Sequence, residues 1–353
     1  MGRVPRRSPE TPRRAPTIRE VAVRAAVSVA TVSAVVNGSR PVRPEVRQRV
    51  EEAIRELGYR PNRLARALQT RRSRTLALVV PSLGNPLFVR LADAVETACH
   101  RSGYALFVAS SQGRPARVRE QAERLMGLGV DGVLAALAWD VVEGLPWAEL
   151  AARGVPVVGA AGTRVVPAVD RFVVDDEDAG RLAGEHLREL GHRVVGFLGV
   201  ADSLATEVRS RGVAAGLGPG GRLVCSEALG HGEAEGAAAT RELLRRAADL
   251  TAVVALNDAM AVGALEALRE AGRPVPGRVS VVGFGDTVAA FAHPKLTTLA
   301  YPTDALGEQA VERLLARLHG RADPPQVCRA AARLLVRAST GPAPGVAAEP
   351  PPA

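Results

Sequence analysis

Apolar residues recur at helical spacing near the amino terminus of the chain. A first helix is predicted to begin at Thr17, because Thr17 and Glu20 have the spacing of a capping box. The apolar face of this helix consists of Ile18, Val21, Ala22 and Ala25. The pattern predicts a short amphipathic helix that packs against a neighbour.

Two more helices are predicted directly after it. Following a break at Ala26-Val27, Ser28 can cap a second helix, which Asn37-Gly38 closes. A third helix is predicted from Pro44 to the stop at Gly58. Residues 17–60 are therefore predicted to form an all-α helix-turn-helix head.

From Thr75 onward, short apolar runs alternate with amphipathic stretches. Such alternation predicts an α/β core in which helices cover parallel sheets on both faces, and its length suits two sheets in series. The predicted strands are 75–80, 104–109, 131–137, 155–160, 171–174, 194–199, 222–227, 252–256, 279–284 and 297–301. The predicted helices are 87–101, 115–128, 146–153, 177–190, 206–216, 233–248, 258–271 and 303–319.

Three segments lack apolar periodicity. Residues 1–16 are rich in proline and arginine, and we expect a disordered basic arm. Residues 61–74 are predicted to form a hinge helix and linker between the head and a core over 75–340. The tail 341–353 is predicted to be disordered.

Charge is distributed unevenly along the chain. The net charge of +9 combines a value of +12 for residues 1–74 with −3 for the remainder. A basic head on a near-neutral body is the distribution expected when one module binds a polyanion and the other has a different task. This favours a DNA-binding head.

The composition argues against several other classes of protein. No apolar run is long enough for a membrane span, and no secretion signal is evident. Cys99, Cys225 and Cys328 are scattered, so we expect neither a disulfide framework nor a metal site, and no cofactor. The chain lacks nucleophile-elbow, phosphate-loop and zinc-protease motifs, which argues against an enzyme.

Several stretches, in order, resemble the lactose-repressor and galactose-repressor (LacI/GalR) family of bacterial regulators. They are TIREVAVRAAVSVATVSAVVNGSRPV, ELGYRPNRLARALQTRRSRT, VVPSLGNPLF, DGVLAAL, VVDDEDAGRLAGEHLRELGHRVVGFLG, ALNDAMAVGALEALREAG and VSVVGFGDT. The resemblance implies a core of two Rossmann-like subdomains similar to periplasmic binding proteins. It also implies a cytoplasmic, nucleoid-associated repressor that binds a two-fold double-stranded DNA operator as a homodimer or tetramer, under the control of a small-molecule effector.

The resemblance also indicates which residues contact DNA. The second helix presents its first turns to the major groove, and its small side chains suit thymine methyl groups rather than bidentate hydrogen bonds. Ala34 stands where the family commonly has a guanine-reading arginine, and Ala26 replaces the usual turn glycine. In the hinge, Leu68 corresponds to the side chain that wedges into the minor groove. The expected DNA-binding residues are Thr17, Ser28, Val29, Ala30, Thr31, Ser33, Ala34, Asn37, Ala65, Arg66 and Leu68.

The effector cleft follows the family pattern less closely. Gly285 and Ala161 stand where the family often has acids that hold sugar hydroxyls. The effector is therefore expected to be a sugar or an anionic metabolite facing Arg209, and a cleft that binds nothing is an alternative. Asp175 and Asp176 could add polarity there or simply cap a helix. The expected effector-binding residues are Asn85, Arg209, His231, Asn257 and Asp286.

A solute-binding protein is the main rival function. Its fold would look like residues 75–340, but it would carry neither the basic head nor the hinge. The basic head and the missing secretion signal favour the regulator.

Overall fold

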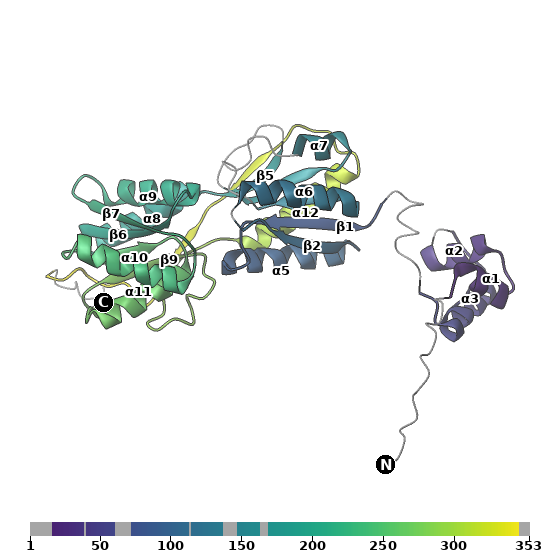
Figure 1. Ribbon diagram of the computed structural model, residues 1–353, viewed down its shortest axis with the longest axis horizontal. Helices are drawn as coiled ribbons and strands as arrows, with labels where there is room; N and C mark the ends of the chain where they lie inside the picture. Colours follow the sequence, from purple (N-terminus) through teal and green to yellow (C-terminus); the bar gives the residue numbers. More distant parts are fainter. Residues whose placement is uncertain are drawn as a thin grey trace, which may run out of the picture. The chain divides into compact units, whose positions relative to one another are not determined.

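The computed structural model describes residues 16–38, 40–60, 72–112, 114–136, 147–162 and 169–345. The chain divides into two compact units, Met1–Ser73 and Arg74–Ala353, which are described separately (Figure 1). The division lies within one residue of the predicted end of the linker.

The first unit contains three helices around a small apolar core. They are α1 (Ile18–Arg24), α2 (Val29–Asn37) and α3 (Pro44–Leu57). Val21, Val32 and Val50 are fully buried, one from each helix. The three predicted helices are confirmed, and Gly58 ends α3 in the left-handed region at φ +63°, as its position predicted.

The second unit contains two six-stranded sheets. Sheet A has the spatial order β11 (Val327–Ala330), β5 (Asp170–Val174), β4 (Val157–Gly162), β3 (Gly132–Ala135), β1 (Thr75–Val80) and β2 (Ala105–Ser110). Sheet B has the order β12 (Arg333–Leu335), β10 (Thr297–Ala300), β9 (Ser280–Phe284), β8 (Ala252–Ala255), β6 (Val194–Val200) and β7 (Arg222–Ala228). All strand pairs are parallel except β10 with β12, so the predicted parallel sheets are confirmed.

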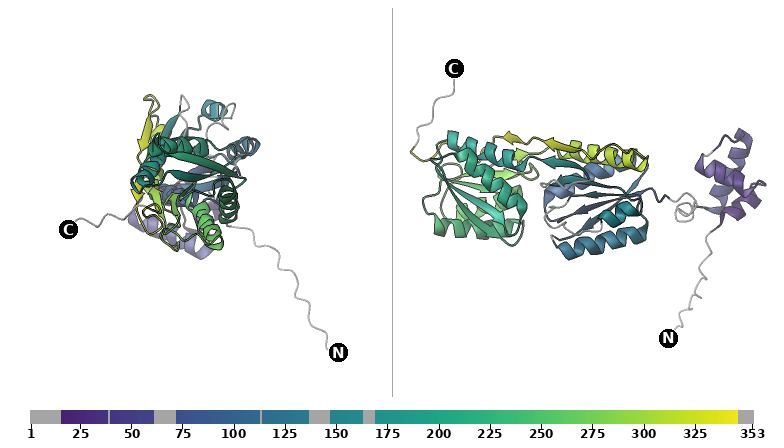
Figure 2. Two further views of the ribbon diagram at one scale, coloured as in Figure 1. Left: turned by 90° about the vertical axis from the view of Figure 1, so that its left-hand side faces the viewer. Right: turned by 90° about the horizontal axis from the view of Figure 1, so that it is seen from above.

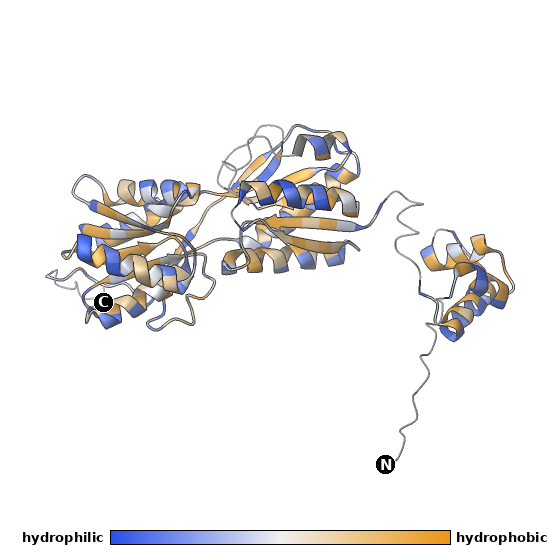
Figure 3. Ribbon diagram, in the orientation of Figure 1, coloured by the Kyte–Doolittle hydropathy of each residue, from blue (hydrophilic) through white to orange (hydrophobic). Residues whose placement is uncertain are grey.

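Helices cover both faces of each sheet (Figure 1, Figure 2). In β1, alternate residues face opposite layers: Leu76 and Leu78 pack in one apolar cluster, and Ala77 and Val79 pack in another. Figure 3 shows the strands as mainly apolar and the helices as two-sided. The helices around sheet A are α5 (Pro86–Arg101), α6 (Pro115–Leu128), α7 (Trp147–Ala152) and α12 (Thr303–Leu318). Those around sheet B are α8 (Asp176–Glu189), α9 (Leu204–Leu217), α10 (Glu233–Arg246) and α11 (Asp258–Glu270).

The chain passes three times between the two subdomains. It crosses from β5 to α8, returns from β10 to α12, and crosses again from β11 to β12. The strands β11 and β12 were not predicted, because each is short and neither has a continuous apolar run. They nevertheless complete one edge of each sheet.

The start of the tail is ordered, which corrects the predicted boundary at residue 341. Ala343 N donates to Leu190 O at 2.8 Å, and Ala343 is 6% exposed. His192 Nε2 lies 3.1 Å from Gly341 O. Backbone hydrogen bonds and a buried histidine therefore hold this segment, although its proline and glycine content suggested disorder.

No helix in the described ranges is by itself long and apolar enough to cross a membrane, and only the bent pair of α1 and α2 meets the criterion of length and composition.

Candidate DNA-binding surface and effector cleft

The turn between α1 and α2 is fixed by two caps and one strained residue. Thr17 and Glu20 form a complete capping box at the start of α1. Thr31 N donates to Ser28 Oγ at 3.1 Å and starts α2. Between them, Ala26 takes φ +53°. The left-handed turn is therefore kept even though alanine replaces glycine.

The first turn of α2 forms the exposed surface of this motif. Ser28, Val29 and Ala30 are exposed, and Val29 retains 41% of its accessible area. Thr31 is half-buried beside Ser28, and the two hydroxyl groups lie 2.9 Å apart. This surface offers two small apolar groups and few hydrogen bonds, which suits contact with methyl groups.

Ala34 is a correction to the expected reading surface. Its side chain is only 2% exposed, whereas a base-reading residue must project from the helix. An alanine side chain ends at Cβ, close to the helix backbone, so neighbouring groups cover it where a long arginine would project. Farther along the helix, Asn37 Nδ2 donates to Ser33 Oγ at 3.0 Å, and both residues are half-buried.

The hinge residues Ala65, Arg66 and Leu68 lie outside the described residues.

In the core, Arg209 lies at the centre of a buried polar cluster. Its Nε donates to Asp176 Oδ1 at 2.8 Å, its Nη2 lies 2.8 Å from the same oxygen, and its Nη1 donates to Leu256 O at 2.6 Å. The guanidinium carbon lies 4.8 Å from the ring centre of Phe284 and 5.5 Å from that of Tyr301. Tyr301 Oη also donates to Asp176 Oδ1, at 2.9 Å. We call Arg209, Asp176, Leu256, Phe284 and Tyr301 the Arg209 cluster.

Burial and charge act in opposite directions on the ionisation of this cluster. Desolvation is the largest single effect and lowers the pKa of Arg209, but the charge and hydrogen bond of Asp176 together with the nearby Tyr301 and Asp258 outweigh it, and the net pKa is raised. Burial raises the pKa of Tyr301 well above its usual value. The cluster is therefore an ion pair with a neutral phenol donor.

His231 and Asn257 lie beside the Arg209 cluster. Asn257 caps α11 by accepting from Met260 N at 2.8 Å, and its Nδ2 donates to His231 O at 3.1 Å. Burial and the positive charge of Arg209 lower the pKa of His231, so its ring is neutral at pH 7. The structure thus brings together three of the expected effector residues, Arg209, His231 and Asn257.

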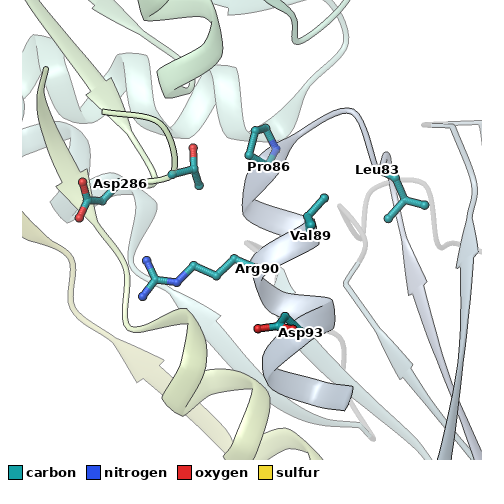
Figure 4. Close-up of a pocket in the computed structure, with 7 residues that line it drawn as sticks. Leu83, Pro86, Val89, Arg90, Asp93 and Asp286 are labelled. Carbon is teal, nitrogen blue, oxygen red and sulfur yellow. The ribbon is translucent and has the colours of Figure 1, made fainter. Parts of the chain in front are cut away.

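Of the other two expected residues, Asp286 lines a pocket beside α5 (Figure 4), whereas Asn85 does not line it but immediately precedes Pro86, which does. Asn85 caps α5 by accepting from Leu87 N at 3.1 Å. The pocket has a volume of about 450 Å³ and is lined by Leu83, Pro86, Val89, Arg90, Asp93, Asp286 and Thr287. Its walls come from both subdomains, because α5 covers sheet A and the loop Gly285–Thr287 follows β9 of sheet B.

This loop joins the pocket to the Arg209 cluster. Phe284, which stacks on Arg209, immediately precedes the loop. Asp258 is fully buried and accepts from Thr287 N at 2.7 Å and from Thr298 Oγ1 at 2.6 Å. Burial raises the pKa of Asp258 despite these hydrogen bonds. The cluster and the pocket together form the candidate effector cleft.

Asp176 is the cleft residue whose partner the sequence did not indicate. The sequence left its role open between cleft polarity and helix capping, and the structure assigns these roles to different residues. Asp175 caps α8 by accepting from Asp178 N at 3.1 Å, whereas Asp176 is 4% exposed and pairs with Arg209. Two adjacent acids at a helix start were a usable signal, because only one is needed as a cap.

These groups can bind a ligand, but they do not form a reactive centre. Every carboxylate and hydroxyl of the Arg209 cluster serves another side chain, and none is a nucleophile beside a free base. Over the described ranges, no group of three or more His, Cys, Asp or Glu side chains could hold a metal ion.

Comparisons with known proteins agree with this division into head and core. Residues 17–62 match the model of bacterial regulatory proteins of the lacI family, and residues 184–340 match a periplasmic binding protein-like domain. The regulator CelR of Thermobifida fusca is 37% identical over 340 residues, which cover 93% of this chain and 99% of that protein.

Solved structures are similar over nearly the whole chain. A complex of the regulator CelR with cellobiose has a TM-score of 0.67 at 34% identity and covers 92% of this chain and 99% of that one. A lac repressor dimer bound to operator and an anti-inducer has a TM-score of 0.82 at 28% identity, with coverage of 93% and 100%. The chain therefore belongs to the LacI family of bacterial regulatory proteins and is a DNA-binding transcription regulator, not an enzyme.

Proposed function

We propose that the chain represses transcription by binding a two-fold operator as a homodimer, and that a carbohydrate-like effector in the cleft changes its affinity for DNA. The observation that carries this proposal is the position of the Arg209 cluster. Asp176 begins α8 directly after the first crossing, and Tyr301 lies in the second crossing, between β10 and α12. A ligand that contacts Arg209 therefore acts on two of the connections between the subdomains.

The coupling follows from the linkage of binding equilibria. An effector that binds one spacing of the subdomains more tightly shifts the protein toward the DNA affinity of that spacing. Bound DNA changes the affinity for the effector by the same factor. Coupling free energies of this kind are about 1–3 kcal/mol, or roughly 5-fold to 150-fold in affinity. We assign ligand contacts to Arg209, His231, Asn257 and Asp286, and a supporting position at the cleft edge to Asn85.

The assignment of a homodimer follows a solved relative. A related lac repressor was solved as a dimer on its operator. A dimer places two heads on DNA and explains why each head needs few base contacts.

In the head we assign base-edge contact to Val29 and Ala30, and phosphate contact to Thr17, Ser28, Thr31, Ser33 and Asn37. Leu68 is proposed as the minor-groove wedge, with Ala65 and Arg66 beside it. Such a regulator acts at the nucleoid.

Selection of binding sites from a random DNA pool tests this proposal. The full chain should enrich sequences made of two half-sites related by two-fold symmetry. A variant with Val29→Asp and Ala30→Asp serves as the matched control, because these exposed positions do not support the fold. If the full chain enriches no common DNA sequence, the proposal is contradicted. Cellobiose, which a CelR complex contains, is the first effector to test for release of the selected DNA.

A further inference from the structure

We propose that Asp176 sets the charge selectivity of the effector cleft, so that the cleft accepts an uncharged hydroxylated effector and excludes a carboxylate or phosphate. This inference rests on the proposed effector role of the cleft. It concerns a residue inside the Arg209 cluster, and of the two expected kinds of effector, a sugar or an anionic metabolite, it favours the uncharged one.

The guanidinium of Arg209 is already neutralised from within the protein. Asp176 Oδ1 lies 2.8 Å from both Nε and Nη2, which is where a ligand carboxylate would otherwise bind. The Arg209 and Asp176 side chains are 10% and 3% exposed, so solvent screens this pair little. An anion could use the Arg209 charge only by displacing Asp176 and leaving a buried carboxylate unpaired.

Two further arginines near the loop after β9 have carboxylate partners as well. Arg90 donates from Nε and Nη2 to Asp304 at 3.1 and 3.0 Å, and Arg337 Nη2 donates to Asp286 Oδ1 at 2.7 Å. Figure 4 shows Arg90 extending from α5 toward the side of the pocket that carries Asp286. An entering anion would therefore meet paired cations.

The remaining polar groups of the cleft suit hydroxyls. A guanidinium has five N–H donors, and the bonds to Asp176 and Leu256 use three, which leaves up to two for a ligand oxygen. Within the described part of the chain, the buried His231 Nδ1 has no hydrogen-bond partner. A hydroxyl can both donate and accept, so it satisfies either tautomer of this ring without adding charge.

Close packing of glycines fixes the backbones that carry Asp176 and Arg209 relative to each other. A Cβ on Gly180 of α8 would collide with the carbonyl oxygen of Arg209, and a Cβ on Gly212 of α9 would collide with that of Glu177. The two helices thus touch through their backbones within one turn of each partner of the ion pair. Asp176 and Arg209 are held together by the backbone as well as by their charges.

The test uses the full chain and sulfate as an anion probe, with chloride at equal ionic strength as the reference. Asp176→Asn keeps an oxygen for Tyr301 and Arg209 but removes the charge. We expect this variant to gain saturable sulfate binding at least about tenfold tighter than that of the wild type, seen as a rise in melting temperature. The double variant Asp176→Asn with Arg209→Gln removes both charges and should lose this gain, which separates it from general salt effects.

Equal sulfate binding by the wild type and Asp176→Asn would overturn the inference. If Asp176→Asn does not fold, the wild type is compared with the double variant. Sulfate binding by the wild type that the double variant lacks would overturn the inference. Equally weak sulfate binding by both proteins would support it. The melting temperatures are measured without DNA, so failure of the operator selection would be distinguishable from failure here.

In the effector arm, each neutral sugar of a panel is paired with its aldonic acid, beginning with cellobiose and cellobionate. Release of DNA by a sugar but not by its acid is expected for the wild type, and release by the acid alone would overturn the inference. For a sugar that releases DNA, Asp176→Asn should reduce the ratio of the affinity for the sugar to the affinity for its acid by about tenfold.

Discussion

The DNA-binding head and the effector cleft use their polar residues in opposite ways. In the head, most of the groups assigned to recognition lie on α2, where Val29 is 41% exposed, and the fold is held by an apolar core that the three helices share. In the cleft, Arg209 and Asp176 are almost fully buried, and recognition and stability depend on the same ion pair. Substitutions in the head can therefore change binding alone, whereas substitutions in the cleft change stability as well.

Removing the head gives the largest expected effect. A chain that begins at Arg74 should lose specific operator binding by at least about 10³-fold, since the specific contacts are assigned to the head. Its melting transition should match that of the core in the full chain, because the two units have separate cores. Fluorescence anisotropy with the selected operator and calorimetry measure the two quantities. Operator binding that survives the deletion would place DNA recognition in the core.

Replacing Arg209 should mainly damage the core. Arg209→Ala leaves the Asp176 carboxylate buried and unpaired, and we expect a loss of about 3–5 kcal/mol in the free energy of unfolding. Chemical denaturation of the full chain measures it. The paired variant with Arg209→Gln and Asp176→Asn should recover most of this loss, because no charge remains buried. If the double variant is as unstable as Arg209→Ala, the cost comes from lost packing and not from the unpaired charge.

A substitution at the glycine contact between α8 and α9 tests the contribution of backbone packing to stability without changing any charge. Gly212→Ala inserts a methyl group against the carbonyl oxygen of Glu177 and should cost about 1–3 kcal/mol. Gly127→Ala in α6 is the matched control, since its new methyl group meets nothing within 4 Å. The control should be neutral or stabilising by up to about 1 kcal/mol, because alanine favours a helix. Urea denaturation compares both, and equal effects would show that the two helices do not touch through these glycines.

The turn in the head should give the smallest effect, of opposite sign. Ala26 adopts φ +53°, which costs an alanine roughly 1–2 kcal/mol relative to glycine, and part of this is returned by the greater freedom of glycine when unfolded. Ala26→Gly should therefore stabilise the head by about 1 kcal/mol or less without changing the preferred DNA sequence. Hydrogen exchange of the backbone amides of the head, measured in the full chain at rising temperature, reports this change in the stability of the head. Destabilisation by glycine would mean that the left-handed turn carries no strain.

Local patterns in the sequence were sufficient for most of the fold. Helix starts at Thr17, Ser28 and Pro44 follow from caps and proline, which act within one turn. Ten of the strands follow from apolar runs, most of them buried on both faces, although the edge strands β2 and β7 are partly exposed. The strands β11 and β12 could not be found in this way, because their pairing partners lie far away in sequence and they carry Arg329 and Arg333.

The sequence predicted which residues lie in the candidate site but not which side chains pair with one another there. Arg209, His231 and Asn257 were expected in one cleft, and they do lie together. The Asp176 partner is separated from Arg209 by a helix and a strand, and no spacing rule links them. Ala34 was misjudged for a related reason, since a position on a recognition helix does not by itself determine how far its side chain projects.

The late strands have a consequence for the order of synthesis. Sheet A receives β11 and sheet B receives β12 from residues near the end of the chain. During translation, both subdomains must therefore emerge from the ribosome with one strand missing from each sheet, and both sheets are completed only after Leu335 has emerged. The head, complete within the first 60 residues, can fold long before this. A nascent chain thus has a finished DNA-binding module before its core has acquired the last strands of its sheets.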